Sequence, residues 1–138
     1  MENKKFKNKY RIESTRLKGW DYSSDAYYFI TICEKNKNMV FGDIKNGFLC
    51  ITPQGKIAIE CWYDLANHYH NCVLDKFVLM PNHLHGIIKI DNDKYASGFV
   101  ETVFKPVSTD GANNKIKYSL SEMMRGFKIF SAKRINKL

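Results

Sequence analysis

Two short apolar runs joined by a two-residue turn constrain the fold of this chain more than any other stretch. The runs are residues 77–80 and 83–90, and Pro81-Asn82 joins them. This pattern predicts two consecutive β-strands with a tight connection. Side chains two residues apart in a strand point to the same face, so His83 and His85 are predicted to lie side by side at the start of the second strand.

The His83-Leu84-His85 pattern has three interpretations when it is taken alone. Both histidines can be structural, with one ring exposed and the other hydrogen-bonded to the turn. They can form part of a metal site whose open coordination positions accept water and substrate. A histidine can also act directly as a general acid–base or as a nucleophile. Imidazole ligands by themselves favour Zn, Ni or Fe over Mg, and the residues do not decide the metal.

Length and charge restrict the class of protein. The chain has 138 residues, which favours a single domain, and its net charge of +8 favours a polyanionic partner, most often nucleic acid. No apolar run approaches the roughly 20 residues that span a bilayer, and the first ten residues lack the apolar segment of a signal peptide. We therefore expect a soluble, intracellular protein without membrane contact.

Cysteine usage excludes two common metal and redox motifs. None of the four cysteines is in C-x-x-C spacing, so neither a zinc ribbon nor a redox pair is indicated. Cys33 and Cys50 lie in apolar, strand-like runs, where we expect them to pack as small hydrophobic residues.

The first half of the chain predicts an arm, two strand regions and a helix. Residues 1–18 form a basic N-terminal arm, and residues 27–33 are β-branched and aromatic, which is typical of a strand. Residues 39–42 and 48–51 are expected to form a hairpin with Asn46-Gly47 near its tip. A helix is predicted to begin with Thr52 as its N-cap and Pro53 in its first turn, and to run to about residue 68.

The second half adds a long loop and a last helix. Residues 91–114 lack a periodic apolar pattern and predict a long, mobile loop. Ser119 and Glu122 have the spacing of a capping box, so they are predicted to start the final helix, whose surface is basic. The resulting order is β, β-hairpin, α, β, β, α. It predicts an α+β fold of the ferredoxin-like βαββαβ type, with an antiparallel sheet, an extra N-terminal hairpin and a basic C-terminal helix.

Three blocks of the sequence resemble one protein family. The turn and its two histidines resemble the HUH motif (His, bulky hydrophobe, His) in the form Leu79-Met80-Pro81-Asn82-His83-Leu84-His85-Gly86. Residues 16–23, followed by 28–33, are similar to an N-terminal signature of the same family, and residues 120–128, followed by 132–136, are similar to its basic helix. Residues 19–138 are thereby identified as an HUH single-tyrosine transposase domain, of the REP-associated tyrosine transposase branch.

This resemblance implies a metal-dependent enzyme that cuts and rejoins single-stranded, hairpin-forming DNA. His83 and His85 would hold Mg²⁺ or Mn²⁺, and a tyrosine would form a 5′-phosphotyrosine intermediate. The family includes obligate dimers, so a homodimer is among the expected partners, and a bacterial, cytoplasmic and nucleoid-associated location is implied. The implied DNA-binding residues are basic: Arg11, Arg16, Lys18, Arg125, Lys128, Lys133 and Arg134.

The nucleophile is the point at which the chain departs from the family pattern. The family tyrosine follows the basic helix, so we expect it, together with a third metal ligand, beyond Leu138; Tyr118 is the candidate within the chain. Two alternatives stay open: a relative that binds DNA without cutting it, and a non-enzymatic ferredoxin-like binding module.

Overall fold

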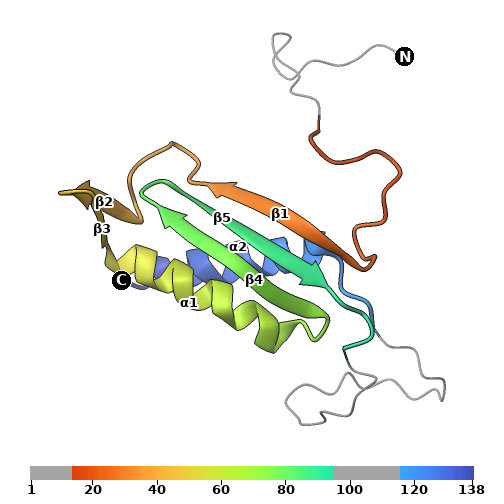
Figure 1. The fold of residues 1–138 in the computed structure, drawn as a ribbon. Coiled ribbons are helices and arrows are strands. Elements are labelled where there is room, and N and C mark those ends of the chain that lie inside the picture. The colour runs from red at the N-terminus through yellow and green to blue at the C-terminus, as the bar shows by residue number, and fades with distance from the viewer. Residues whose placement is uncertain (1–13, 95–115) are drawn as a thin grey trace, which may run out of the picture.

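A computed structural model describes residues 14–94 and 116–138, and it contains the predicted order of elements (Figure 1). Residues 1–13, which include Arg11, and most of the predicted loop at 91–114 lie outside the described ranges. The elements are β1 (Ala26–Cys33), β2 (Gly42–Lys45), β3 (Phe48–Ile51), α1 (Pro53–His68), β4 (Cys72–Met80), β5 (His83–Ile90) and α2 (Leu120–Ile135).

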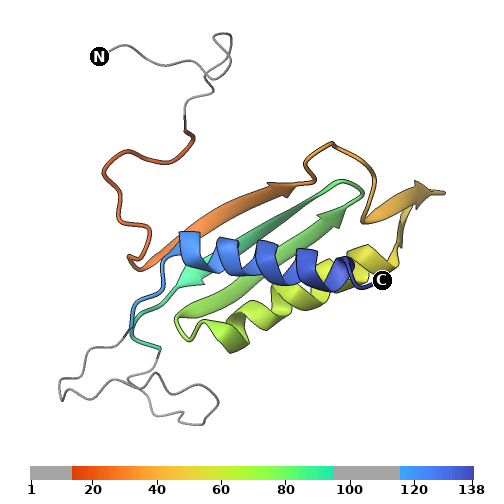
Figure 2. The same ribbon diagram turned by 180° about the vertical axis from the view of Figure 1, so that it is seen from behind.

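The main sheet has the strand order β1-β5-β4, and β5 is antiparallel to both neighbours. Both helices lie against one face of this sheet, while the other face is uncovered in the view of Figure 1; Figure 2 shows the helices from behind. We call the uncovered side the outer face. The prediction of an α+β fold with an antiparallel sheet and two helices is therefore confirmed.

Alternation along β5 separates the two faces. Leu84, Gly86, Ile88 and Ile90 are buried, whereas the residues between them are half-buried. A Cβ atom on Gly86 would overlap the ring of Trp62 from α1, so this glycine allows the indole to lie directly against the strand. The even-numbered residues of β5 thus face the helices, and the odd-numbered residues face outward.

Both helices begin at the predicted capping residues. The Thr52 side chain accepts a hydrogen bond from the Gly55 amide at 3.0 Å, and Pro53 occupies the first turn. Ser119 and Glu122 form the reciprocal bonds of a capping box. Each cap satisfies amides that a helix leaves without intrahelical partners, so the two start points are confirmed.

The first strand of the hairpin lies closer to the turn than predicted. Its first strand is β2 at Gly42–Lys45, and residues 39–41 precede it. Asn46 and Gly47 have φ angles of 52° and 81°, and Lys45 pairs directly with Phe48. Two residues with positive φ make a two-residue hairpin turn, which sets the pairing outward from the turn. The apolar run at 39–41 therefore belongs to the connection, and the prediction of a strand there was wrong.

The cysteines also differ from expectation. Cys33 and Cys50 are exposed, although they lie on strands, whereas Cys61 and Cys72 are buried. Burial raises the pKa of the Cys72 thiol to about 11, so this side chain is a neutral core residue at ordinary pH. Within the described ranges, no helix is both long enough and apolar enough to cross a membrane.

The contact between Gly86 and Trp62 can be tested by stability. We expect Gly86→Ala to lower the free energy of unfolding by about 2 kcal/mol or more, because the added methyl group enters the volume of the indole. Urea denaturation followed by circular dichroism measures the change. In the double variant Gly86→Ala/Trp62→Phe the smaller ring makes room, so its cost should be less than the sum of the two single costs. An unchanged midpoint for Gly86→Ala would contradict this account.

Candidate functional site

The two histidines of β5 lie together on the outer face of the sheet. The ring centroids of His83 and His85 are 4.8 Å apart, and the rings are nearly perpendicular. Both residues are half-buried, so the rings are partly open to solvent. The predicted side-by-side placement of the two imidazoles is confirmed.

Each imidazole uses its Nδ1 atom to contact a neighbouring polar side chain. His83 Nδ1 lies 2.7 Å from Asn82 Oδ1, and His85 Nδ1 lies 2.9 Å from Thr31 Oγ1. An amide oxygen only accepts hydrogen bonds, so neutral His83 donates from Nδ1 and keeps the Nε2 lone pair unprotonated. The Thr31 hydroxyl can either donate to His85 Nδ1 or accept from it, so this contact orients the His85 ring without fixing its tautomer. A histidine ligand usually donates its second ring N–H to such a partner, which orients the ring toward a metal.

A loop after β1 holds the turn that carries Asn82. The Glu34 amide donates to the Asn82 carbonyl at 2.9 Å, and Asn82 Nδ2 donates to the Lys37 carbonyl at 3.3 Å. The Glu34 carboxylate accepts from the amides of Asn36 and Asn38 and so closes the loop on itself. The connection therefore fixes the side chain that orients His83. It also places the exposed Lys37 beside the turn, a location that the sequence reasoning missed.

The sheet register adds neighbours that the sequence reasoning did not associate with the histidines. Thr31 pairs with His85 and Cys33 pairs with His83, so both point to the outer face. Phe29 stacks on the His85 ring, with ring centroids 5.4 Å apart and an interplanar angle of 22°. The strand predicted at residues 27–33 already implied that Phe29, Thr31 and Cys33 share a face, because side chains two residues apart do so, but it did not identify the partner strand.

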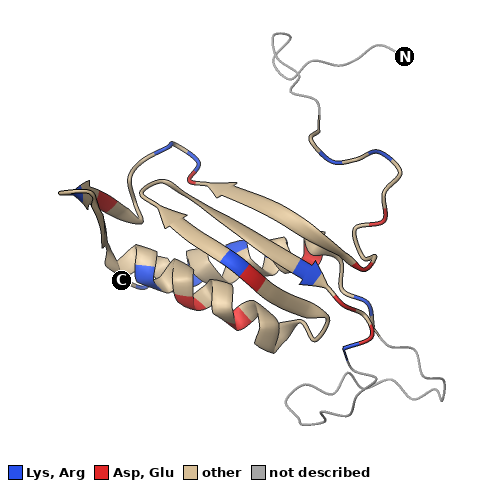
Figure 3. Cartoon of the chain, viewed as in Figure 1, with Lys and Arg blue, Asp and Glu red and all other residues tan. Residues whose placement is uncertain are grey.

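The basic residues of α2 are not beside the histidines. Arg125, Lys128 and Lys133 belong to a helix on the covered face of the sheet, opposite the pair (Figures 2 and 3). Arg134 donates to Asp64 on α1 at 2.8 Å, and this bond lowers the pKa of the Asp64 carboxyl. Arg134 therefore contributes to the contact between the two helices, whatever else it binds.

The two predicted DNA-binding residues before β1 lie on the exposed N-terminal segment. The Arg16 guanidinium lies 5.7 Å from the centroid of the Tyr22 ring, which is within the range of a cation–π contact. Lys18 is exposed just before Gly19, which has a φ of 80° and turns the chain toward β1. Neither residue contacts the histidine pair.

Tyr118 lies far from the histidines. Its carbonyl accepts a hydrogen bond from Asn71 Nδ2 at 2.9 Å, next to the point where Cys72 pairs with Ile90. Ile90 is seven residues from His83 on β5, which is about 23 Å along a strand. The Tyr118 ring packs edge-on against Tyr69, 5.1 Å away between ring centroids. Within one chain the structure does not bring this tyrosine to the pair.

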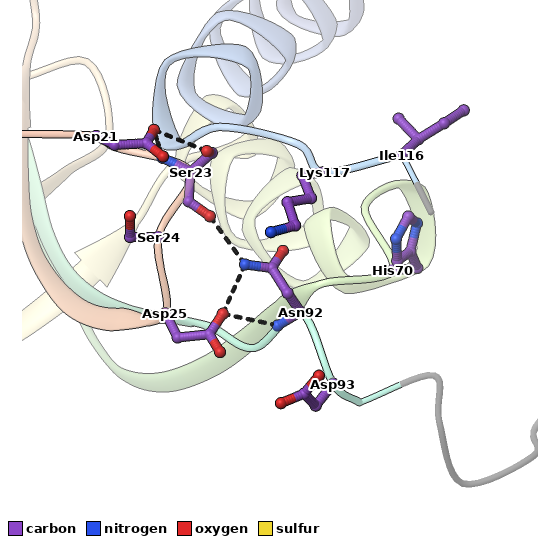
Figure 4. Close-up of a pocket in the computed structure, with 9 residues that line it drawn as sticks. All are labelled: Asp21, Ser23, Ser24, Asp25, His70, Asn92, Asp93, Ile116 and Lys117. Atoms are coloured by element: carbon purple, nitrogen blue, oxygen red, sulfur yellow. Dashed lines mark hydrogen bonds between the residues drawn. The ribbon is translucent and has the colours of Figure 1, made fainter. Parts of the chain in front are cut away.

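A hollow of about 350 Å³ occupies this far end of the molecule (Figure 4). Its polar groups largely bind one another: Asn92 donates to Asp25 Oδ1 at 2.6 Å and to the Ser23 carbonyl at 2.9 Å, and Asp21 accepts from Ser23. These bonds connect the segment before β1 to the end of β5. In the described parts of the chain, no group of three or more His, Cys, Asp or Glu side chains is arranged to hold a metal ion.

The tautomer of His83 is a direct test of this geometry. We expect ¹⁵N NMR at a pH where the ring is neutral to show a protonated Nδ1 and an unprotonated Nε2. Asn82→Ala removes the acceptor, so the population should shift toward the Nε2–H form. Asn38→Ala, in the neighbouring loop, keeps the acceptor and serves as the control. A predominant Nε2–H form in the unaltered protein would contradict the geometry.

Part of this chain is similar to a curated bacterial protein. A 77-residue segment, 56% of this chain, is 46% identical to a curated protein of Haemophilus influenzae (strain Rd) described as an uncharacterized protein. The match covers 43% of that relative, so the chain spans less than half of its length. No protein-family model and no solved structure matches the chain.

Proposed function

We propose that this chain is a DNA-processing domain of the HUH single-tyrosine transposase type. In this proposal it binds single-stranded, hairpin-forming DNA and holds Mg²⁺ or Mn²⁺ at His83 and His85. One observation carries the proposal: two imidazoles lie side by side on the outer face of the sheet, and the Nδ1 atom of each contacts a polar neighbour. When each ring donates from Nδ1, both Nε2 atoms remain for a shared metal.

The fold supports the proposal. β1 and β4 flank β5, and α1 lies between β1 and β4 in the sequence, which is the split β-α-β arrangement. β1, α1, β4, β5 and α2 take the first five places of a βαββαβ pattern, and the β2–β3 hairpin is inserted after β1. We therefore propose the finer assignment to the ferredoxin-like fold.

The donor set at the pair fits a divalent cation with open coordination positions. Two imidazole nitrogens leave room for a phosphate oxygen and for further ligands. A metal bound there supplies charge neutralisation to the scissile phosphate. Asn82 and Thr31 orient the two rings, and the Glu34 loop holds Asn82 in place. Covalent cleavage in this proposal has a tyrosine hydroxyl attack phosphorus, which gives a 5′-phosphotyrosine and releases a 3′-hydroxyl.

The attacking tyrosine is not Tyr118 of the same chain, because Tyr118 lies at the far end of the sheet. A tyrosine outside the described residues, or one from a second copy of the chain, takes that role in the proposal. Binding without cleavage is the second candidate. It is favoured by the remoteness of Tyr118 and because, among the described residues, no group of three or more His, Cys, Asp or Glu side chains is arranged to hold a metal ion.

The charges suggest two DNA contacts. Lys35 and Lys37 are exposed in the loop beside the histidine turn and suit the phosphates of a single strand that enters the site. Arg125, Lys128 and Lys133 lie on the helical side, which suits the paired stem of a hairpin. This division assigns the single strand to the outer face and the stem to the helices.

Metal binding is the first test. We expect His83→Ala and His85→Ala each to weaken Mn²⁺ binding at least tenfold, since each removes one ligand. Electron paramagnetic resonance of free Mn²⁺ measures the affinity. His68→Ala is the matched control, because His68 stacks on Phe130 at the end of α1 and is expected to leave the affinity unchanged. Equal affinity in all four proteins would refute the metal site.

DNA binding and cleavage are the second test. The affinity for a hairpin with a single-stranded flank should fall steeply with salt. Lys35→Ala and Lys37→Ala should each reduce the slope by about 0.7–0.9, the value for one phosphate contact, whereas Lys56→Ala on α1 should not change it. An adduct of protein and DNA that survives SDS in the presence of Mn²⁺ identifies the cutting enzyme. Salt-dependent binding without an adduct identifies the binding-only candidate, and the absence of binding refutes both.

A further inference from the structure

We propose that Tyr27 and Phe29 form a stacking platform for the bases of the single strand that passes the histidine pair. We call these two residues the aromatic platform. This inference rests on the proposed function and goes further than it, because it names the part of the DNA that the outer face binds and the residues that bind it.

The exposure of these two rings is the starting observation. Tyr27 is 66% exposed and Phe29 is 70% exposed, although both lie inside the eight-residue strand β1. The residues between and beside them, Tyr28 and Ile30, are buried beneath the sheet. Large aromatic side chains contribute most when they are covered, so two such rings on an open face indicate a surface that receives a partner.

The register places the aromatic platform in line with the site. Along β1 the outward side chains follow in the order Thr31, Phe29, Tyr27, and Thr31 pairs with His85. Neighbours on one face of a strand are about 7 Å apart, so a DNA strand whose phosphate lies at the histidines passes Phe29 first and Tyr27 next. Phe29 already stacks on the His85 ring, so the aromatic platform is continuous with the histidine pair.

The charges around the aromatic platform favour nucleic acid over a second protein chain as its partner. β1 carries no acidic residue between Ala26 and Cys33. Lys89 pairs with Tyr27 across the strands, and Lys35 lies in the loop at the other end of β1. The Lys89 ammonium group forms an ion pair with Asp91 at 2.8 Å, so of these two cations Lys35 is the one that has no such ion pair among the described residues. Exposed rings near a basic loop are typical of single-strand binding surfaces, and exposed aromatic side chains on a sheet stack two or three bases in RNA-recognition domains.

The test compares two strands that differ only in their bases. One is a short oligothymidylate, and the other is an abasic strand of the same length and charge. We expect Tyr27→Ala to weaken binding of the oligothymidylate about 5- to 100-fold, the usual effect of removing one stacking ring. Binding of the abasic strand should change less than about twofold. Tyr27→Phe keeps the ring and should bind both strands as the unaltered protein does.

Phe29→Ala should also weaken binding of the oligothymidylate more than binding of the abasic strand. Because this variant removes the contact with His85 as well, the decisive variant is Tyr27→Ala. Phe48→Ala is the matched control, because Phe48 is exposed on the β2–β3 hairpin, away from the outer face. Circular dichroism and thermal unfolding show whether each variant is folded. A variant that loses affinity for both strands equally would overturn the platform, because that loss does not involve bases.

Three further outcomes separate the failure of this inference from the failure of the proposed function. Equal binding of the two strands by the unaltered protein overturns the platform and leaves the DNA-binding proposal intact. Binding of neither strand overturns the platform, and the proposed function fails as well only if the hairpin with its single-stranded flank also does not bind. If Tyr27→Ala converts a dimer to a monomer in sedimentation and leaves the oligothymidylate affinity unchanged, the face joins two copies of the chain and the platform is overturned.

Discussion

The packing of the Trp62 ring against Gly86 decides which face of β5 is open to solvent. Because the indole occupies the space above this glycine, residues 84, 86, 88 and 90 must point toward the helices. A slip of one residue would send both histidines into the core and would leave unpaired polar rings there. The exposure of His83 and His85 is therefore a consequence of how α1 packs on the sheet.

A second constraint operates at the opposite end of the sheet. The buried Asn71 donates to Asn92 Oδ1 at 3.0 Å and to the Tyr118 carbonyl at 2.9 Å, and Asn92 in turn binds Asp25. The Leu120 amide, at the start of α2, donates to the Tyr22 carbonyl. The segment before β1, the end of β5 and the start of α2 are thus held by buried or partly buried hydrogen bonds, which are costly to leave unmade. This hydrogen-bonding explains why the hollow of Figure 4 is lined by polar groups that already have partners.

The type and order of the elements could be predicted from the sequence, since their signals are local. Thr52 and Ser119 cap helices through neighbours only three residues away, and the His-x-His pattern needs only the period of a strand. The surroundings of the site could not be predicted, because Thr31 and His85 are 54 residues apart and meet only through the register of β1 with β5. The location of the basic residues could not be predicted either, because a count of basic residues does not show that α2 lies on the covered face of the sheet.

The alternation along β5 also separates stability from chemistry within a single strand. Every second residue of β5 packs into the core, whereas the residues between them lie on the outer face and are only half-buried. Substitutions at the odd-numbered positions therefore change what the outer face presents without changing how the helices pack. A chain built in this way can lose or exchange a reaction while it keeps its fold, so its relatives can diverge in activity more rapidly than in structure. The same separation makes the outward-facing positions of β5 convenient places to introduce new metal-binding side chains.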